Sequence, residues 1–271
     1  MVHPQIATFA RLADGGARPT RKIEGQTTLL SRTIHAIAYD EIHDEFSVPV
    51  PFPQAILTFR GGADGEEAPI RIIQGSRTQL KSPNRLAVDP VHNEIFVPQE
   101  DEVLVFPRDG NGNVAPLRVL KGPDTRLGAS AVAVDPVRNL LVVAGEWDDE
   151  GVRFRIFNRT DQGNVKPKAV IGGPKSGFLS LSGPFAVYPP RGWIIAGDRA
   201  GVASALASDQ GYVGVWSIED NGDVPPRWRI GGPKGFLQMP RGVTLNPKYK
   251  ELIVSDKRQN AVLTFYVPEL F

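Results

Sequence analysis

Four polar side chains occupy one recurring place in the sequence, immediately before a short apolar run. These are His35, Asn84, Ser130 and Arg241, and in one further unit Gly183 takes this place. Imidazole, amide and hydroxyl groups form hydrogen bonds, and arginine binds carboxylates through two parallel bonds. If these side chains meet, the sequence predicts a surface for a small polar or anionic ligand or a peptide. The alternative is that they are solvated residues around a water-filled channel.

A second recurring place carries carboxylates. Each follows the second apolar run of its unit, and the four residues are Glu100, Glu146, Asp198 and Asp256. Carboxylates that crowd together raise one another's pKa, which is how a general acid or base is made. The sequence therefore predicts that these side chains belong to the same ligand-binding face. The alternative is that each acid is separately solvated in its loop.

Both places belong to an internal repeat. A proline followed six residues later by a glycine occurs five times, at Pro19, Pro69, Pro116, Pro167 and Pro226. The spacings between these prolines are 50, 47, 51 and 59 residues, so one structural unit recurs and the last spacing contains an insertion. Residues 197–211 form this insertion, which is either a lid over the binding face or a decorated loop.

Short runs with a period of two fill each unit. In the second unit they are Leu86–Val88, Glu94–Val97, Val103–Phe106 and Pro116–Leu120. Such runs between turn residues are typical of β-strands, and four strands per repeat of this length indicate a β-propeller. The position before the innermost strand borders the axial funnel of a propeller, which is why the recurring polar residues are candidates for a binding site.

Counting the runs gives the number of blades. The first two strands of a unit occur five times, which predicts one all-β domain over residues 1–271 with five blades, or six as the alternative. We expect the two ends to share a blade, with residues 20–24 completing the strand at 261–265, because closure removes exposed sheet edges. This leaves residues 6–9 as a surplus strand.

The sequence also resembles the NHL-repeat propellers. The resemblance rests on residues 82–89, 94–97 and 103–106, and again on 239–244 with 251–256. It is more distant to the regucalcin and gluconolactonase-like propellers, where an Asn, an Asp and a Glu hold a divalent metal. Asn84 matches the Asn of that set, but Arg241 stands in the Asp place, and a cation does not bind a metal. We therefore predict no metal site, and the sequence identifies no cofactor.

Composition narrows the classes of function. The 31 basic and 30 acidic residues nearly cancel, so a long basic nucleic-acid surface is not predicted. Some NHL propellers bind single-stranded RNA on a basic face, so the resemblance implies RNA as a candidate partner. Here the recurring Arg21, Arg71 and Arg118 are spread over different units. The absence of cysteine excludes disulfides and thiolate chemistry, and no apolar run reaches the roughly 20 residues of a membrane span.

Two functions remain. The first is a binding propeller that recognises a small polar or anionic ligand or a peptide at the funnel. The alternative is a hydrolase or lyase of the lactonase kind that uses the same funnel, with or without a metal.

The Asp-Gly-Asn-Gly-Asn run at 109–113 resembles the start of a calcium loop, but Leu120 stands where an EF-hand loop needs Glu, so a tight turn is favoured.

Overall fold

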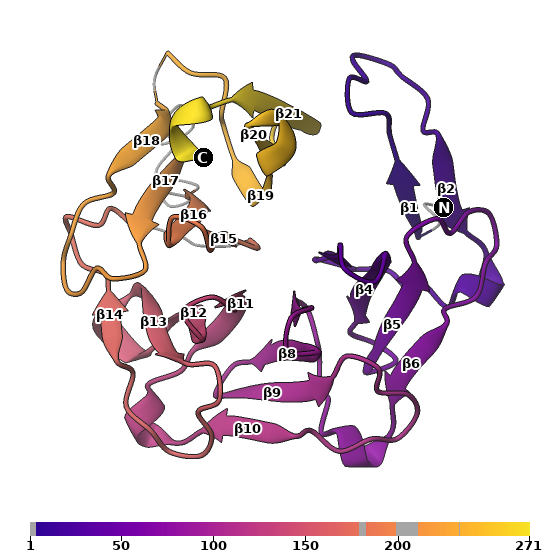
Figure 1. Ribbon diagram of the computed structural model, residues 1–271, viewed down its shortest axis with the longest axis horizontal. Coiled ribbons are helices and arrows are strands. Elements are labelled where there is room, and N and C mark those ends of the chain that lie inside the picture. Colours follow the sequence, from indigo (N-terminus) through magenta and orange to yellow (C-terminus); the bar gives the residue numbers. More distant parts are fainter. Residues whose placement is uncertain (1–3, 179–182, 199–210, 233) are drawn as a thin grey trace. The chain divides into compact units, whose positions relative to one another are not determined.

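The computed structural model describes residues 4–178, 183–198, 211–232 and 234–271. These residues form β-strands and short 3₁₀ turns, and the strands of each sheet run antiparallel in chain order (Figure 1). The prediction of an all-β propeller of five blades is confirmed. Most of the insertion at 197–211 lies outside the described residues.

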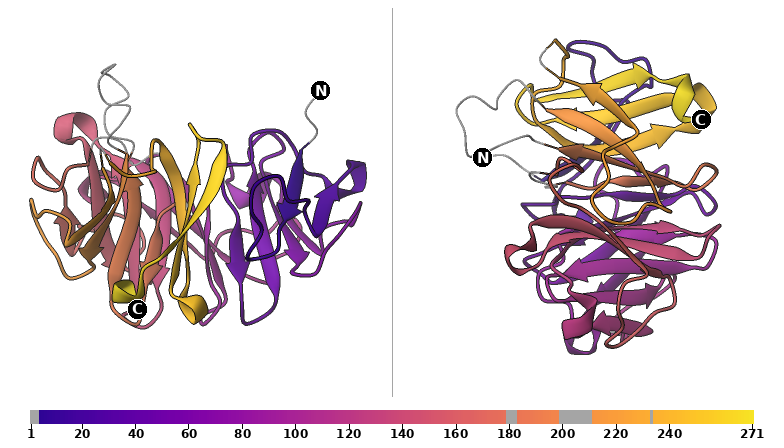
Figure 2. Two further views of the ribbon diagram at one scale, coloured as in Figure 1. Left: turned by 90° about the horizontal axis from the view of Figure 1, so that it is seen from above. Right: turned by 90° about the vertical axis from the view of Figure 1, so that its left-hand side faces the viewer.

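Four blades have four strands each, and together with the fifth blade they appear as separate twisted sheets (Figure 2). The first blade is β3 (Ala38–Asp40), β4 (Glu45–Val50), β5 (Ala55–Arg60) and β6 (Arg71–Gln74). The second is β7 (Ala87–Asp89), β8 (Glu94–Gln99), β9 (Glu102–Pro107) and β10 (Arg118–Lys121). The third is β11 (Ala129–Asp135), β12 (Leu140–Glu146), β13 (Val152–Asn158) and β14 (Ala169–Ile171). The fourth is β15 (Ala186–Tyr188), β16 (Trp193–Asp198), β17 (Tyr212–Ser217) and β18 (Trp228–Gly231).

The remaining strands lie near the two ends of the chain. The fifth blade contains β19 (Pro240–Asn246), β20 (Glu251–Asp256) and β21 (Ala261–Tyr266), and the hairpin of β1 (Gln5–Thr8) and β2 (Arg21–Glu24) forms its own sheet. Short 3₁₀ turns occur at Gln26–Thr28, Ser76–Thr78, Pro123–Thr125, Asp148–Glu150, Pro247–Tyr249 and Pro268–Leu270. No helix in the described part of the chain is long and apolar enough to cross a membrane.

The predicted pairing of the two ends is wrong in one respect. β2 pairs in register with β1, from Gln5 opposite Glu24 to Thr8 opposite Arg21. The other edge of β2 forms a parallel bridge from Ile23 to Gly65. Both edges of β2 therefore have partners. Residues 20–24, which we expected to complete β21, pair instead with β1, the strand that we expected to be surplus.

The chain forms two compact units. The first comprises residues 1–97 and 105–117, and the second comprises residues 98–104 and 118–271. In the first unit a cluster around Phe46 and Phe59 forms a core, with these two rings stacked 5.3 Å apart. In the second unit a cluster around Phe154 and Trp216 does so, with ring centroids 5.8 Å apart. Phe59, Phe154 and Trp216, which lie in the third strands of their blades, are thus buried.

Glycine-containing turns connect successive units of the repeat. Parallel bridges join Ile23 to Gly65, Ile73 to Gly112, Leu120 to Gly163 and Ile171 to Gly222. Around Gly112, Asn111 Oδ1 accepts a bond from Ile72 N at 2.9 Å, and Asn113 Oδ1 accepts one from Arg77 N at 2.7 Å. Gly112 has a φ of 75°, a conformation that glycine adopts without strain. The run at 109–113 is therefore a turn that fastens β6.

We expect Asn111→Ala and Asn113→Ala each to lower the free energy of unfolding by about 1 kcal/mol, because each leaves a backbone N–H without its acceptor. Chemical denaturation measures the loss. Asp109→Ala is the matched control, since Asp109 is exposed in the same turn. Its effect should stay within about 0.5 kcal/mol. Equal losses for all three variants would contradict the assigned role of the two asparagines.

Candidate functional site

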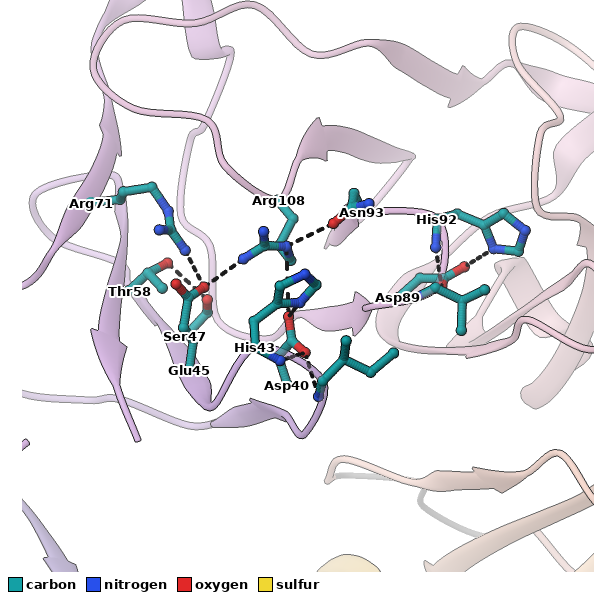
Figure 3. Close-up of polar contacts among 12 residues, drawn as sticks. Asp40, His43, Glu45, Ser47, Thr58, Arg71, Asp89, His92, Asn93 and Arg108 are labelled. Carbon is teal, nitrogen blue, oxygen red and sulfur yellow. Dashed lines mark hydrogen bonds and ion pairs between the residues drawn. The ribbon is translucent and has the colours of Figure 1, made fainter. Parts of the chain in front are cut away.

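Two of the histidines have a structural role in the first unit. In the turn after β3, Asp40 Oδ1 accepts bonds from the backbone N–H groups of Ile42 and His43, both at 3.0 Å. His43 Nδ1 lies 2.8 Å from Asp40 Oδ2. Asp89 and His92 form the same arrangement after β7, with 2.8 Å between Nδ1 and Oδ2 (Figure 3). These histidines are turn residues, each three positions after a turn aspartate.

A group of charged side chains surrounds these turns. Glu45 Oε2 accepts a bond from Arg108 Nη1 at 2.6 Å and another from Arg71 Nη2. Arg108 Nε donates to Asn93 Oδ1 at 3.0 Å and lies 3.6 Å from Asp40 Oδ2 (Figure 3). The side chains of Glu45, Arg71 and Arg108 are each less than a fifth exposed. This group ties the first blade to the second, and sequence reasoning missed it.

His35 is placed differently from these two histidines, because it is exposed and lies beside Asn84. Its Nδ1 is 3.1 Å from Asn84 Oδ1, although 49 positions separate the two residues. Asn84 Nδ2 in turn donates to Ser82 O at 3.0 Å. The sequence predicts that residues at this place in successive repeats come together. Within the first compact unit, His35 and Asn84 do so.

The orientation of Asn84 fixes the chemistry of His35. Because the amide nitrogen of Asn84 donates to Ser82 O, its oxygen faces His35 and can only accept. Nδ1 of His35 is therefore the protonated nitrogen. In the neutral ring Nε2 then carries the lone pair and accepts hydrogen bonds, and in the imidazolium it donates them.

Gly183 and Arg241 also hold the same place in successive repeats, and they lie side by side in the second compact unit. A Cβ built on Gly183 would lie 1.1 Å from the main-chain oxygen of Arg241, so only glycine permits this approach. The guanidinium of Arg241 makes no hydrogen bond or ion pair within the described part of the chain. A cationic group that pairs with none of the described residues thus stands next to a position without a side chain.

Ser130 and two of the predicted carboxylates lie at one end of the third blade. Glu100 exchanges backbone hydrogen bonds with Ala129, which precedes Ser130, and Ala129 pairs with Gly145, which precedes Glu146. Ser130 Oγ donates to Ala144 O at 3.1 Å. Glu100 and Glu146 are exposed. The second unit therefore brings these three candidates to the same end of the sheet.

The other two carboxylates are buried. Asp256 is 2% exposed and accepts four backbone bonds, from the N–H groups of Gln238, Met239, Arg258 and Gln259. Burial alone would raise the pKa of Asp256, but these four donors outweigh it and hold the pKa below its ordinary value. Asp256 therefore organises the ends of two strands.

Asp198 is fully buried at the end of β16, opposite Tyr212 in β17. Burial raises the pKa of the Tyr212 hydroxyl to about 12, the charge of Asp198 adds to the rise, and Arg229 opposes it. The hydroxyl stays protonated and donates to Gly177 O at 2.9 Å. The guanidinium of Arg229 lies 4.7 Å from the centre of the Tyr212 ring.

Among the described residues, no group of three or more His, Asp or Glu side chains is arranged to hold a metal ion.

Comparison with known proteins identifies the class of fold. No family model matches the sequence, and no curated protein matches it. A chain in the crystal structure of a nidogen/laminin complex is similar with a TM-score of 0.59 and 17% identity, over 86% of this chain and 75% of that one. A chain in the crystal structure of the mitotic checkpoint complex gives a TM-score of 0.56 and 13% identity, over 92% of this chain and 65% of that one. The present chain thus spans slightly less than two thirds of the checkpoint-complex chain, and identities this low show the β-propeller fold alone.

Proposed function

We propose that this protein is a binding propeller of the NHL type that recognises a small polar or anionic ligand, or a peptide, through the loops that precede the first strand of each blade. The observation that carries the proposal is the exposed contact between His35 and Asn84. Two side chains from successive blades meet there, and their hydrogen-bonding roles are fixed before any ligand arrives. Preorganised polar groups bind with less loss of entropy than mobile ones.

The ligand chemistry follows from these groups. Nε2 of His35 accepts a hydrogen bond from an N–H or O–H of the ligand when the ring is neutral, and it attracts a carboxylate when the ring is charged. None of the described residues pairs with the guanidinium of Arg241, and we propose that it binds an anionic group of the ligand. Ser130, Glu100 and Glu146 supply further polar groups at the end of the third blade.

The proposal also fits the solved structures of similar fold, which are chains of a nidogen/laminin complex and of the mitotic checkpoint complex. The hydrolase or lyase alternative keeps no support from Asp256, because the backbone N–H groups of four residues occupy its carboxylate. We therefore favour recognition over catalysis.

Calorimetric titration tests the proposal with two probes, succinate as a dicarboxylate and an acetylated, amidated trialanine as a neutral peptide. We expect saturable binding of one of them, weakened at least about tenfold in His35→Ala and Asn84→Ala.

His92→Gln is the matched control for these variants, since it removes an imidazole that holds a turn. It should leave the affinity unchanged. Arg241→Ala should weaken succinate binding and spare the neutral peptide, and Arg241→Lys should restore it poorly because it lacks the two-pronged geometry. If neither probe binds saturably, or if His92→Gln weakens binding as much as His35→Ala, the proposed function is wrong.

A further inference from the structure

A pocket of about 300 Å³ lies in the second unit, away from the proposed binding loops. Trp193, which begins β16, lines it, and so does Ser217, the residue opposite Trp193 at the end of β17. Asp198 stands at the other end of β16, so the pocket and the predicted carboxylates belong to opposite ends of this blade. The repeat pattern alone does not predict this pocket.

Three arginines line the pocket: Arg138, Arg191 and Arg227. The carboxylate of Glu219 lines it as well, and Asp135 and Asp220 form ion pairs with Arg138 and Arg227. Guanidinium groups are the side chains best suited to carboxylate and phosphate, because their planar donors match two oxygens at once.

Arg138 is held rigidly in this wall. Its Nη1 donates to Asp135 Oδ2 at 3.0 Å and to Pro189 O at 2.6 Å. Gly192 makes room for the guanidinium, since a Cβ there would lie 2.9 Å from its central carbon. Arg138 therefore contributes a fixed positive charge, largely balanced by the buried Asp135.

Arg191 and Arg227 use only part of their donors in contacts with the described residues. Arg191 Nη2 donates to Phe271 O at 3.0 Å, and Arg227 Nη2 donates to Asp220 Oδ1 at 2.7 Å. A guanidinium carries five N–H groups, so each of these side chains retains further donors. The guanidinium of Arg227 also lies 5.8 Å from the centre of the Trp193 ring, which orients it and forms an apolar wall.

We propose that this pocket binds an oxyanion, the carboxylate or phosphate group of a small ligand, with Arg191 and Arg227 as the donors and Trp193 as the apolar wall. The oxyanion accepts hydrogen bonds from both guanidinium groups. None of the pocket residues belongs to the loops around His35, so the two proposals stand or fall independently.

Tryptophan fluorescence tests the site, because the indole of Trp193 lies against Arg227. The protein is titrated with sodium phosphate in one arm and sodium citrate in the other, and sodium chloride keeps the ionic strength constant. We expect a saturable change in at least one arm, and its absence in Trp193→Phe. The arm that saturates identifies phosphate or carboxylate as the preferred group.

The double variant Arg191→Gln/Arg227→Gln should weaken binding at least about tenfold. Arg227→Lys keeps the charge and loses the paired donors, so it should weaken oxyanion binding by a smaller factor. This variant also shows whether a loss of binding in the double variant reflects a failure to fold. Arg77→Gln, an exposed arginine of the first unit, is the control and should bind as the wild type does. His35→Ala should also bind normally.

A change without saturation in both arms would overturn the proposal. So would equal affinities of the wild type and the double variant at constant ionic strength.

Discussion

Replacing Asp256 with alanine should lower the free energy of unfolding by about 3–5 kcal/mol, one of the two largest effects we expect from a single substitution. The carboxylate accepts four backbone hydrogen bonds from two chain segments, at distances from 2.7 to 3.1 Å. Alanine would leave these donors without acceptors at a site that is 2% exposed. Chemical denaturation followed by circular dichroism measures the loss.

Asp256→Asn is the matched comparison, since its amide retains one acceptor oxygen. Its loss should be smaller than that of Asp256→Ala. If alanine costs less than about 1 kcal/mol, which is within reach of an ordinary surface substitution, the carboxylate does not organise these strands.

The same residue predicts a dependence on pH. Because the folded state holds the pKa of Asp256 below its ordinary value, the unfolded chain binds the proton more tightly than the folded one. The stabilisation is therefore complete above the unfolded pKa of about 3.9, and it is lost as the pH falls through the folded pKa. The wild type should lose more stability between about pH 5 and pH 2 than Asp256→Asn does.

Replacing Glu45 with alanine should cost about 2–4 kcal/mol, because it removes the carboxylate that two arginines share. Arg71 and Arg108 would remain as largely buried guanidinium groups, with side chains 18% and 14% exposed. Such charges lose their compensation when one partner is removed, which costs more than the pair contributed when intact.

Glu67→Ala is the control for Glu45, since Glu67 pairs with Arg60, whose side chain is 56% exposed. Exposed ion pairs contribute little because water screens them, so the loss at Glu67 should be clearly smaller. Equal losses at the two positions would show that burial of the Glu45 group does not matter to stability.

The blades could be predicted from the sequence because each strand is short, alternates with period two and ends in turn residues. In the second blade the expected runs at 94–97 and 103–106 lie within β8 (Glu94–Gln99) and β9 (Glu102–Pro107). The pairing of β2 could not be predicted, since residues 6–9 and 261–265 carry similar patterns. Closing the short loop between β1 and β2 costs about 2–3 kcal/mol less entropy than closing one of some 240 residues, which favours the local partner.

The candidate site could be predicted in part. His35 and Asn84 hold the same place in successive repeats, and so do Gly183 and Arg241. The members of each pair lie in contact. The role of Asp256 could not be predicted, because an acid in a turn and an acid at a binding face have the same residue type. Only the structure shows the four backbone donors.

The arginine pocket left a weak signal in the sequence. Arg138 takes the repeat position of His43 and His92, each three residues after a turn aspartate. Arg227 follows its repeat proline where Ile70 and Leu117 stand in other units. Either arginine alone looks like ordinary variation between repeats. That Arg138 and Arg227 line one pocket is a result of how the chain packs in the folded state.

The measurement that tests the central claim most directly is nitrogen-15 NMR of the His35 imidazole during titration with succinate and with the neutral trialanine peptide. The account predicts that the neutral ring is protonated at Nδ1, and that the Nε2 signal moves saturably with one probe. The signals of His43 and His92, which hold turns through Asp40 and Asp89, should stay in place. A ring protonated at Nε2, or histidine signals that all move together without saturation, would contradict it.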